Sequence, residues 1–399
     1  MRPLAIRALS AISAIGRGAE PMFDALSNRR GGLSPCDFAG VTSGWIGRVP
    51  GVESHAVPPR LAHFDCRNNR LADMALHTDG FAARVAEARA RLGADRIGVV
   101  VGTSTSGVGA LEDAYVARDP VSGALPPDFD FVHTHDLSSL ASYVREALDL
   151  AGPALTVSAA CASSARCFVD AAHFIETGVC DAVVVGGADS LCGMTLRGFA
   201  SLGLVSPRAC RPCDTARDGV SIGEAAGFAL LEPLWTNSGR TAVPGLAVLG
   251  TGSSSDAHHM SAPHPEALGA VLAMRAALAD AGLAPEAIDY VNLHGTGTRA
   301  NDAMEDRAVM TVFGSGVPGS ATKGWTGHTM GSSGILELAI SALCIEHDMV
   351  PGCLAVDEVD PSFEALVVTV NEHRTVRRVI SNSFGFGGIN CSLILGRTS

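Results

Sequence analysis

Lysine is almost missing from this sequence: Lys323 is the only one, and arginine supplies the rest of the 29 basic residues. Acidic residues outnumber basic ones, and the formal net charge is −12. This balance excludes the broad basic surface of a nucleic-acid-binding protein and a polybasic membrane anchor. The one lysine lies among glycines and small residues in the segment 320–333, five residues before His328. We therefore treat Lys323 as a candidate functional residue.

Long apolar runs are also absent. The longest, such as residues 181–188, fall well short of the roughly 20 residues with which a helix spans a membrane. The N-terminal segment superficially resembles a signal peptide, but Arg7 interrupts its apolar run, and we expect a strand followed by a turn there. We therefore expect a cytoplasmic protein with no membrane span.

Neither a disulfide framework nor a metal or nucleotide site is indicated. The 11 cysteines are odd in number and irregularly spaced, as expected for reduced thiols. Cys210 and Cys213 form a C-x-x-C pair, but no second close pair follows to complete a zinc site. The segment 254–265 contains three histidines and is the other metal-like candidate. No G-x-G-x-x-G pattern opens a helix, so we expect no nucleotide cofactor.

Aromatic residues make up only 5% of the chain, whereas apolar residues make up 47%, so the core is built mainly from Ala, Val, Leu and Gly. Short β-branched runs alternate with longer Ala-rich segments, which is typical of an α/β protein with a largely buried sheet. We expect strands at 97–105, 154–160, 181–189, 245–253 and 289–297, two strands in 379–395, and helices at 140–150, 161–178, 218–232, 267–282 and 334–348. The same rhythm resumes after a join near 235–246, which is compatible with a duplicated fold.

Cys161 follows the strand expected at 154–160 and opens the helix expected at 161–178. Unpaired N–H groups and the dipole at a helix N-terminus stabilise a thiolate, which lowers the pKa of a thiol and makes it nucleophilic. The small residues around Cys161 would admit an acyl group. A buried structural cysteine is the alternative interpretation, and position alone does not decide between the two.

Two histidines lie at the ends of expected elements. His294 ends the strand expected at 289–297, and His328 comes just before the helix expected at 334–348. Each alone could be structural, but two histidines in Gly/Thr loops at such ends indicate a site. The glycine-rich turn 385–388 leaves backbone N–H groups free for a close approach, and could complete an oxyanion hole with the N–H of Cys161.

Four motifs, AACASSA, VNLHGTGTRAND, TKGWTGHTMGSSG and NSFGFGGIN, resemble those of one family in order and spacing. They are similar to the β-ketoacyl-[acyl carrier protein] synthases of the thiolase fold, of the elongating type with a Cys-His-His triad. The resemblance covers essentially the whole chain. It implies an α/β fold in which two duplicated βαβαβαββ halves, residues 1–240 and 241–399, form a five-layer αβαβα sandwich. The segment 254–265 then resembles a family loop near the tunnel entrance, which we favour over a metal site.

In such an enzyme Cys161 would take the acyl chain as a thioester. His294 and His328 would then donate hydrogen bonds to the thioester carbonyl of a malonyl carrier protein as its carboxylate leaves. The resemblance also implies that the backbone N–H groups of Cys161 and Phe384 form the oxyanion hole, and that the Phe384 ring gates the second substrate. No cofactor is implied, because the substrates are carried on the phosphopantetheine arm of an acyl carrier protein.

Five further positions are assigned to substrate binding by the resemblance. Thr296 and Thr298 match threonines that bind the phosphopantetheine arm. Phe199 and His259 match residues near the tunnel, and Thr105 takes a place in the acyl pocket where an aliphatic side chain would be expected.

The surroundings of Lys323 leave two roles open. It could orient His328 and tune the local field, or it could hold Glu337 in a buried ion pair. Arginine would suit neither role, because a guanidinium is a wide planar fork. Asp302 and Glu305 match an acidic pair behind the active site, and a network that joins them to Lys323 is a hypothesis.

The expected partner is an acidic acyl carrier protein, which needs a basic docking patch on this acidic chain. Arg60, Arg67 and Arg70 are the best candidates. Residues 119–144 contain no lysine or arginine, although family members often carry a second basic cluster there. This departure puts the usual docking pose in doubt.

Three alternatives stay open at this level. A chain-length-factor subunit is the non-enzyme alternative, but such subunits lack the nucleophile that Cys161 supplies. The pathway is either housekeeping fatty acid elongation or a specialised type II polyketide-like system, and residues 64–72 favour the ketosynthases of aryl polyene clusters. The chain would then form a heterodimer with a chain-length-factor-like homologue, where fatty acid enzymes form homodimers.

Overall fold

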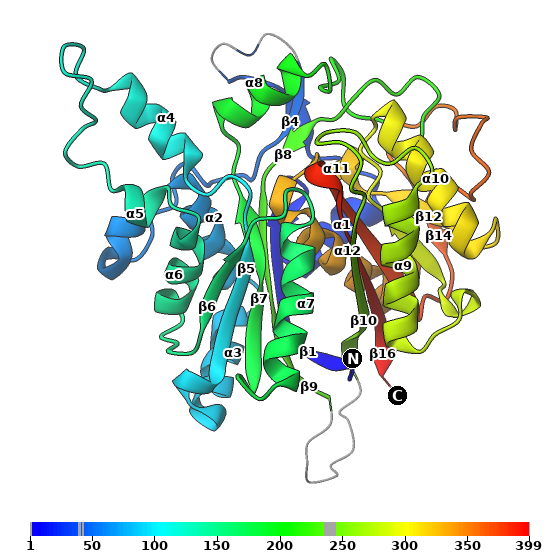
Figure 1. Ribbon diagram of the computed structural model, residues 1–399, viewed down its shortest axis with the longest axis horizontal. Coiled ribbons are helices and arrows are strands. Elements are labelled where there is room, and N and C mark those ends of the chain that lie inside the picture. Colours follow the sequence, from blue (N-terminus) through cyan, green and yellow to red (C-terminus); the bar gives the residue numbers. More distant parts are fainter. Residues whose placement is uncertain (1, 39–40, 42–43, 235–244, 399) are drawn as a thin grey trace.

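The computed structural model describes residues 2–38, 41, 44–234 and 245–398, and an 11-stranded sheet runs through the whole molecule (Figure 1). Ten strands follow the order β12-β11-β15-β16-β10-β1-β9-β7-β5-β6, and β2 (Gly16–Arg17) pairs with the end of β1, as the expected strand and turn require. The ten strands are β1 (Leu4–Ser13), β5 (Ile97–Gly102), β6 (Ala154–Val157), β7 (Ala182–Asp189), β9 (Ala225–Pro233), β10 (Gly245–Ser255), β11 (Tyr290–Leu293), β12 (Gly319–Ala321), β15 (Arg378–Gly385) and β16 (Ile389–Thr398).

The sheet consists of the same five-strand pattern used twice. β6, β5 and β7 are parallel neighbours, and β9 runs antiparallel between β7 and β1. Likewise β12, β11 and β15 are parallel neighbours, and β16 runs antiparallel between β15 and β10. The two patterns meet where β1 pairs with β10 through Leu4–Val248 and Ala5–Ala247. The expected duplication is therefore confirmed, while the expected boundary after residue 240 lies outside the described residues.

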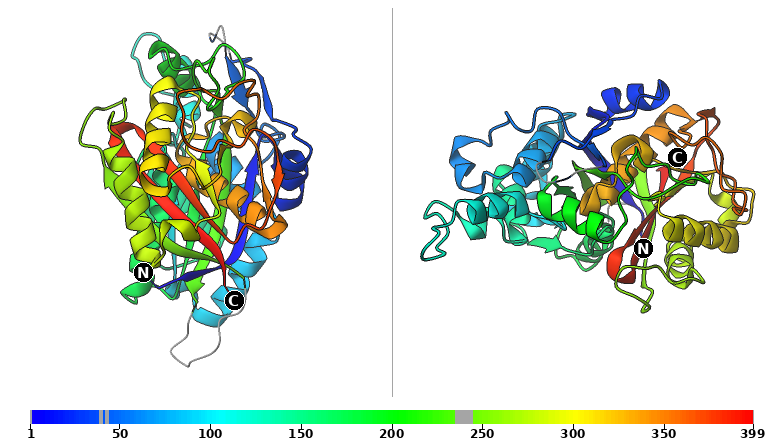
Figure 2. Two further views of the ribbon diagram at one scale, coloured as in Figure 1. Left: turned by 90° about the vertical axis from the view of Figure 1, so that its right-hand side faces the viewer. Right: turned by 90° about the horizontal axis from the view of Figure 1, so that it is seen from above.

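Helices form three layers around the two halves of the sheet. On the outside, α2 (Arg67–Leu76), α3 (Phe81–Leu92) and α6 (Ser138–Ala147) cover the first half, and α9 (Leu268–Ala281) covers the second, with α10 (Arg299–Phe313) packed on α9. Between the halves lie α7 (Ser163–Glu176) and α12 (Ser333–His347), which contact strands of both. Seen from above in Figure 2, the blue and cyan helices lie opposite the yellow α9 and α10. This is the expected five-layer αβαβα sandwich.

Shorter elements build the loops around these layers. They are α1 (Ala19–Ser27), α4 (Val108–Val116), α5 (Phe131–Thr134), α8 (Gly193–Ser201), α11 (Lys323–Thr326), β3 (Leu33–Pro35), β4 (Trp45–Gly47), β8 (Ile222–Gly223), β13 (Met349–Val350) and β14 (Glu372–His373). Within the described ranges, every helix is too short or too polar to cross a bilayer.

The helix expected at 218–232 is wrong, because most of this segment is strand β9. Its alanines favour a helix by propensity, but the strand is buried between β1 and β7. Successive residues face opposite sides: Ala229 and Leu231 join the apolar cluster between the halves, and Phe228 and Leu230 join the outer cluster. Burial on both faces made the segment uniformly apolar and hid its period of two.

The two central helices approach each other very closely. A Cβ added to Gly334, the second residue of α12, would lie 2.5 Å from the backbone nitrogen of Ala165 on α7. Glycine is therefore required for this packing distance, which brings the N-terminal ends of α7 and α12 together. Those ends carry the residues that the sequence marks as functional.

We expect Gly334→Ala to lower the free energy of unfolding by about 1–3 kcal/mol, because the added methyl group meets backbone that cannot move away. Gly109→Ala is the matched control: Gly109 is also the second residue of a helix, and a Cβ there meets nothing within 4 Å. This control should gain up to about 1 kcal/mol from helix propensity. Urea unfolding of both variants measures the difference, and equal stabilities would contradict the close packing.

Candidate active site

Cys161 lies on a sharp turn between β6 and α7. Ala160, immediately before it, has φ +48°, a left-handed conformation that costs an L residue about 1–2 kcal/mol. The hydroxyl of Ser163 holds the turn, since it donates to the carbonyl oxygen of Ala160 (2.6 Å) and accepts from the N–H of Ala159 (2.9 Å). Helix α7 begins at Ser163, so Cys161 lies just before the helix. The sequence had predicted that Cys161 is the first residue of this helix.

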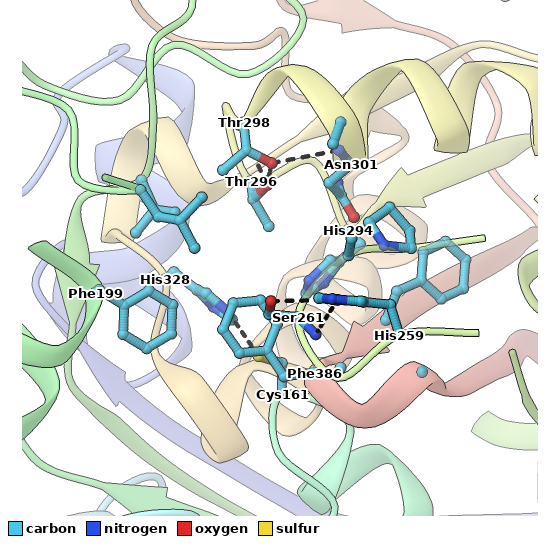
Figure 3. A pocket seen from close by; sticks show the side chains of 18 of the residues that line it. Cys161, Phe199, His259, Ser261, His294, Thr296, Thr298, Asn301, His328 and Phe386 are labelled. Atoms are coloured by element: carbon cyan, nitrogen blue, oxygen red, sulfur yellow. Dashed lines mark hydrogen bonds between the residues drawn. The ribbon is translucent and has the colours of Figure 1, made fainter. Parts of the chain in front are cut away.

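His328 lies in the loop between α11 and α12, and both nitrogens of its ring have partners. Nε2 is 2.9 Å from Sγ of Cys161 (Figure 3), and Nδ1 is 3.0 Å from Oγ of Ser333. The backbone N–H of His328 donates to the carbonyl oxygen of Ser221 (2.7 Å), which ties this loop to the segment before β8. The imidazole is buried, so its contacts are shielded from solvent.

His294 follows β11 in the loop that leads to α10. The carboxylate of Glu305, on α10, accepts from the backbone N–H groups of His294 and Gly295, each at 2.8 Å. Nδ1 of His294 is 3.3 Å from Nζ of Lys323. An ammonium can only donate, so Nδ1 accepts and the neutral ring carries its proton on Nε2.

The three side chains converge from distant parts of the chain. Sγ of Cys161 and one ring nitrogen each of His294 and His328 all lie within 4.8 Å of one another. Three such atoms could also approach a metal ion. However, a thiolate and an imidazole on one tetrahedral zinc would lie about 3.5 Å apart, given their bond lengths, whereas Sγ and Nε2 are 2.9 Å apart. The pair has the geometry of a hydrogen bond, which suits proton transfer and nucleophilic chemistry.

Lys323, the first residue of α11, is 1% exposed and lies at the centre of a cluster of polar atoms. Its ammonium donates to Oε1 of Glu337 and to the carbonyl oxygen of His294. The expected ion pair with Glu337 is therefore present. We predicted that Lys323 orients His328. The Lys323 ammonium instead contacts the ring of His294, so the prediction chose the wrong histidine.

Burial determines the charge states of the site. Burial, followed by the positive charge of Lys323, holds the pKa of His294 and of His328 well below the usual range, so both rings are neutral at neutral pH. Burial raises the pKa of Cys161 to about 11, against the opposing effect of Lys323. The expected lowering of this pKa is therefore wrong, and the resting pair is a thiol that donates to neutral Nε2 of His328.

Phe386, rather than Phe384, occupies the position next to the nucleophile. The backbone N–H of Phe386 faces the Cys161 sulfur and favours its charged form. The Phe386 ring stacks on that of Phe199, with centroids 5.4 Å apart, at the pocket (Figure 3). Phe384 is buried against His294, with ring centroids 5.9 Å apart. The motif NSFGFGG places two phenylalanines two residues apart, and the sequence carried no signal to choose between them.

A pocket of about 510 Å³ opens beside the triad (Figure 3). The triad contributes to its lining, together with four of the expected substrate-binding residues: Phe199, His259, Thr296 and Thr298. Thr105 is not in this lining; it is buried, and its hydroxyl donates to Asp189 (2.7 Å). Arg299, which the sequence did not single out, is the only lysine or arginine among the described residues that line the pocket.

The acidic pair behind the site holds the backbone of the His294 loop. Asp302 accepts from the N–H groups of Gly297 (3.2 Å) and Cys213 (2.9 Å), and Glu305 holds His294. Over the described ranges neither carboxylate hydrogen-bonds to Lys323, so the hypothetical network through the lysine is not formed directly. The pair acts on the histidine through the backbone.

The three arginines expected to dock a carrier protein are engaged within the chain. Arg67 makes a two-pronged ion pair with Glu224, which is fully buried, with N–O distances of 2.6 and 2.7 Å. Arg70 pairs with Asp65 (2.6 Å), and Arg60 donates to two backbone carbonyls of α6 and lies near an aspartate. The ion pair with Glu224 gives Arg67 a structural role within the chain, and the assignment of Arg60, Arg67 and Arg70 to docking stays a prediction.

Comparisons with known proteins identify the family of this chain. Residues 62–237 match the family model "Beta-ketoacyl synthase, N-terminal domain", and residues 246–357 match "Beta-ketoacyl synthase, C-terminal domain". A 3-oxoacyl-[acyl-carrier-protein] synthase 2 of Coxiella burnetii is 32% identical over 99% of both chains. A ketosynthase solved in complex with its chain length factor, from Xenorhabdus doucetiae, is 36% identical over 100% of this chain and 98% of its own, with a TM-score of 0.90. The ishigamide ketosynthase/chain length factor is 30% identical over the full length of both, also with a TM-score of 0.90.

We expect Lys323→Met, combined with Glu337→Gln to avoid an unpaired carboxylate, to move the acidic limb of the pH–rate profile to higher pH. Lys323 lowers the pKa of both histidines, so its loss lets them protonate nearer the ordinary value of about 6.5. The wild-type limb should lie well below that value. Rates of acylation of Cys161 measured across pH give the profiles.

Lys323→Arg is the charge-preserving companion variant. It should lose at least about ten-fold in rate, since a guanidinium cannot take the place of Nζ between His294 and Glu337. Near wild-type activity of this variant, or an unmoved acidic limb in the neutral double variant, would contradict the assigned role.

Proposed function

Because this chain belongs to the β-ketoacyl synthase family and is an acyltransferase, we propose that it condenses an acyl chain held on Cys161 with a malonyl unit held on an acyl carrier protein. The observation that carries the proposal is the contact between Sγ of Cys161 and Nε2 of His328, beside a second neutral histidine, at the inner end of a pocket. The reaction is a decarboxylative Claisen condensation.

Acyl transfer comes first. The thiol proton of Cys161 passes to Nε2 of His328 as the sulfur attacks the thioester carbonyl of the acyl carrier protein. The backbone N–H groups of Cys161 and Phe386, which face the sulfur, are placed to donate to the oxyanion that forms on that carbonyl. The bond to the phosphopantetheine sulfur then breaks, and the departing thiolate takes the proton from the His328 imidazolium.

Condensation follows with malonyl carrier protein in the pocket. His294 donates through Nε2–H to the thioester carbonyl oxygen, since Lys323 holds its Nδ1 as an acceptor. When Nε2 of His328 carries a hydrogen, it donates to the same oxygen. CO₂ leaves, and the resulting carbanion attacks the acyl carbonyl on Cys161, which breaks the acyl bond to Sγ and releases the Cys161 thiolate. Thr296 and Thr298 present hydroxyls along the pocket for the amides of the arm, and Arg299 offers a positive charge to an anionic substrate.

A chain-length-factor subunit is the alternative from another class, a partner without catalysis. Cys161, its strained turn and its hydrogen bond to His328 favour the enzyme, because a subunit that only shapes the product has no need of an activated thiol.

We propose that the condensation serves a specialised type II polyketide-like pathway of the aryl polyene kind, with a chain-length-factor-like homologue as partner. Two of the similar solved structures are ketosynthases with their chain length factors. Among the strands that the structure describes, β6 lies at the end of the sheet and pairs on one side only, and its Leu155 is 44% exposed. Near it the arm formed by α4, α5 and the chain between them projects from the body (Figure 1) and exposes Val116, Val121 and Phe131. An uncovered edge and an apolar arm suit a permanent partner of the same fold.

Cys161→Ala should abolish the acyl-enzyme that wild-type protein forms with acyl carrier protein, as seen by intact mass spectrometry. Cys344→Ala is the matched control, because Cys344 is a buried thiol of α12 outside the site. The control should retain the adduct. An adduct that persists in Cys161→Ala would refute the assignment of the nucleophile.

Co-expression with its gene neighbours followed by native mass spectrometry should give a one-to-one complex with a homologue that lacks the nucleophilic cysteine. Leu155→Asp should weaken that complex, because it buries a charge at the covered edge. An active homodimer of this chain alone would instead favour fatty acid elongation.

A further inference from the structure

We propose that Asp189 is a positioning residue of the active site: its carboxylate, in the first half of the molecule, holds the loop of the second half that presents His328 to Cys161. The inference rests on the condensing reaction proposed above and concerns the same site. It starts from a buried carboxylate that takes no part in the chemical steps of that reaction.

Asp189 is the last residue of β7, and its side chain is completely buried. Within the described ranges no lysine, arginine or histidine forms an ion pair with it. Donors from the segment after β5 surround it instead: the hydroxyls of Thr103 and Ser104 at 2.6 Å, that of Thr105 at 2.7 Å, and the backbone N–H groups of the last two at 2.9 and 2.8 Å. Burying a charge without a counter-ion is costly, so this set of charge-assisted hydrogen bonds favours a role for Asp189 beyond packing.

One further donor comes from the other half of the molecule. The backbone N–H of Gly331, three residues after His328, donates to Oδ2 of Asp189. A Cβ on Gly331 would lie only 2.6 Å from this oxygen, so glycine is required for the carboxylate to reach the backbone. The motif GHTMGSS therefore contains both the histidine and the glycine through which its loop is anchored.

The loop between His328 and α12 needs an anchor because its backbone is strained. Met330 has φ +55°, a left-handed conformation that is unfavourable for an L residue and persists only where the surroundings enforce it. Before Met330, the backbone N–H of His328 is bound to the carbonyl oxygen of Ser221. After Met330, the N–H of Gly331 is bound to Asp189. Together these two attachments set the position of the imidazole.

The anchored loop also touches the turn that carries the nucleophile. A Cβ on Gly331 would lie 3.1 Å from Cβ of Ser163, whose hydroxyl holds the sharp turn before Cys161. The loops of the thiol and of its base therefore meet beside the carboxylate of Asp189. The 2.9 Å contact between Sγ of Cys161 and Nε2 of His328 consequently depends on this carboxylate.

Asp189→Asn separates this role from the other contacts of the side chain. The amide oxygen can replace Oδ1, which accepts from the backbone N–H groups of Ser104 and Thr105. The amide NH₂ then takes the place of Oδ2, where the Ser104 hydroxyl can turn to accept but the N–H of Gly331 cannot.

Ser104→Ala is the matched control. It removes a hydroxyl that donates to the same oxygen, Oδ2, and leaves the contact between that oxygen and the N–H of Gly331 in place. The hydroxyl's own contact with this N–H is longer, at 3.3 Å. This control should therefore match wild type.

In single-turnover experiments we expect Asp189→Asn to lower two saturating rates about ten- to hundred-fold, because a displacement of about 1 Å at a reacting group can cost that much. One is the acylation of Cys161, followed by intact mass, and the other is condensation from pre-acylated enzyme. The carrier-protein concentration that gives half the saturating rate should not change, since Asp189 does not line the pocket. Wild-type rates in a folded Asp189→Asn, a raised half-saturating concentration in place of the lower rates, or an equal fall in Ser104→Ala would each overturn the inference.

Gly331→Ala tests the same contact from the other side, because its methyl group would force the loop away from Oδ2. It should lower both rates in the same way, and wild-type rates would overturn the inference. In wild-type protein, amide hydrogen exchange of residues 329–332 should be slow, and exchange as fast as in the exposed segment 119–124 would overturn it without any substitution. Wild-type protein that forms no acyl-enzyme would instead overturn the proposed function, whatever the exchange result.

Discussion

The active site depends on one buried ion pair, between Lys323 and Glu337. The Lys323 ammonium contacts the side chain and the backbone carbonyl of His294, and its charge lowers the pKa of both His294 and His328. From this position it fixes the tautomer of the His294 ring, adds to the burial that keeps both rings neutral, and opposes the rise in the pKa of Cys161 that burial causes. The carboxylate makes the buried cation tolerable. Arginine supplies every other basic side chain of this chain, but a planar guanidinium would not fit these three contacts.

In the proposed reaction the thiol of Cys161 acts as a nucleophile without being ionised at rest. Burial keeps Cys161 protonated, and the same burial keeps His328 neutral, so the proton has an acceptor at hydrogen-bond distance. Charge appears only while the substrate reacts, when the nearby N–H groups and imidazoles can stabilise it. A buried thiol beside neutral imidazoles therefore combines an uncharged resting state with donors placed to stabilise charge in the transition state.

Much of this arrangement could be predicted from the sequence. Cys161, His294 and His328 each lie in a glycine- or small-residue-rich loop after a strand or before a helix, which marks them as candidates, and the resemblance of four motifs to one family assigned their roles. The contacts that the sequence did not reveal have a different origin. The pairing of Arg67 with Glu224 joins residues 157 positions apart, and nothing local announces it. The partner of Lys323 and the choice between Phe384 and Phe386 depend on backbone paths within a turn. Strand β9 was missed because burial on both faces erased its alternation.

The duplication places Cys161 and Lys323 at equivalent positions of the two halves. Cys161 lies between β6 and α7, and Lys323 lies in the corresponding connection between β12 and α12 of the second half. The same architectural position therefore carries the thiol of Cys161 in the first half. In the second half it carries the ammonium of Lys323, which lowers the pKa of both histidines. Each half therefore supplies a group that the other half needs, so the two halves form one site only as a pair.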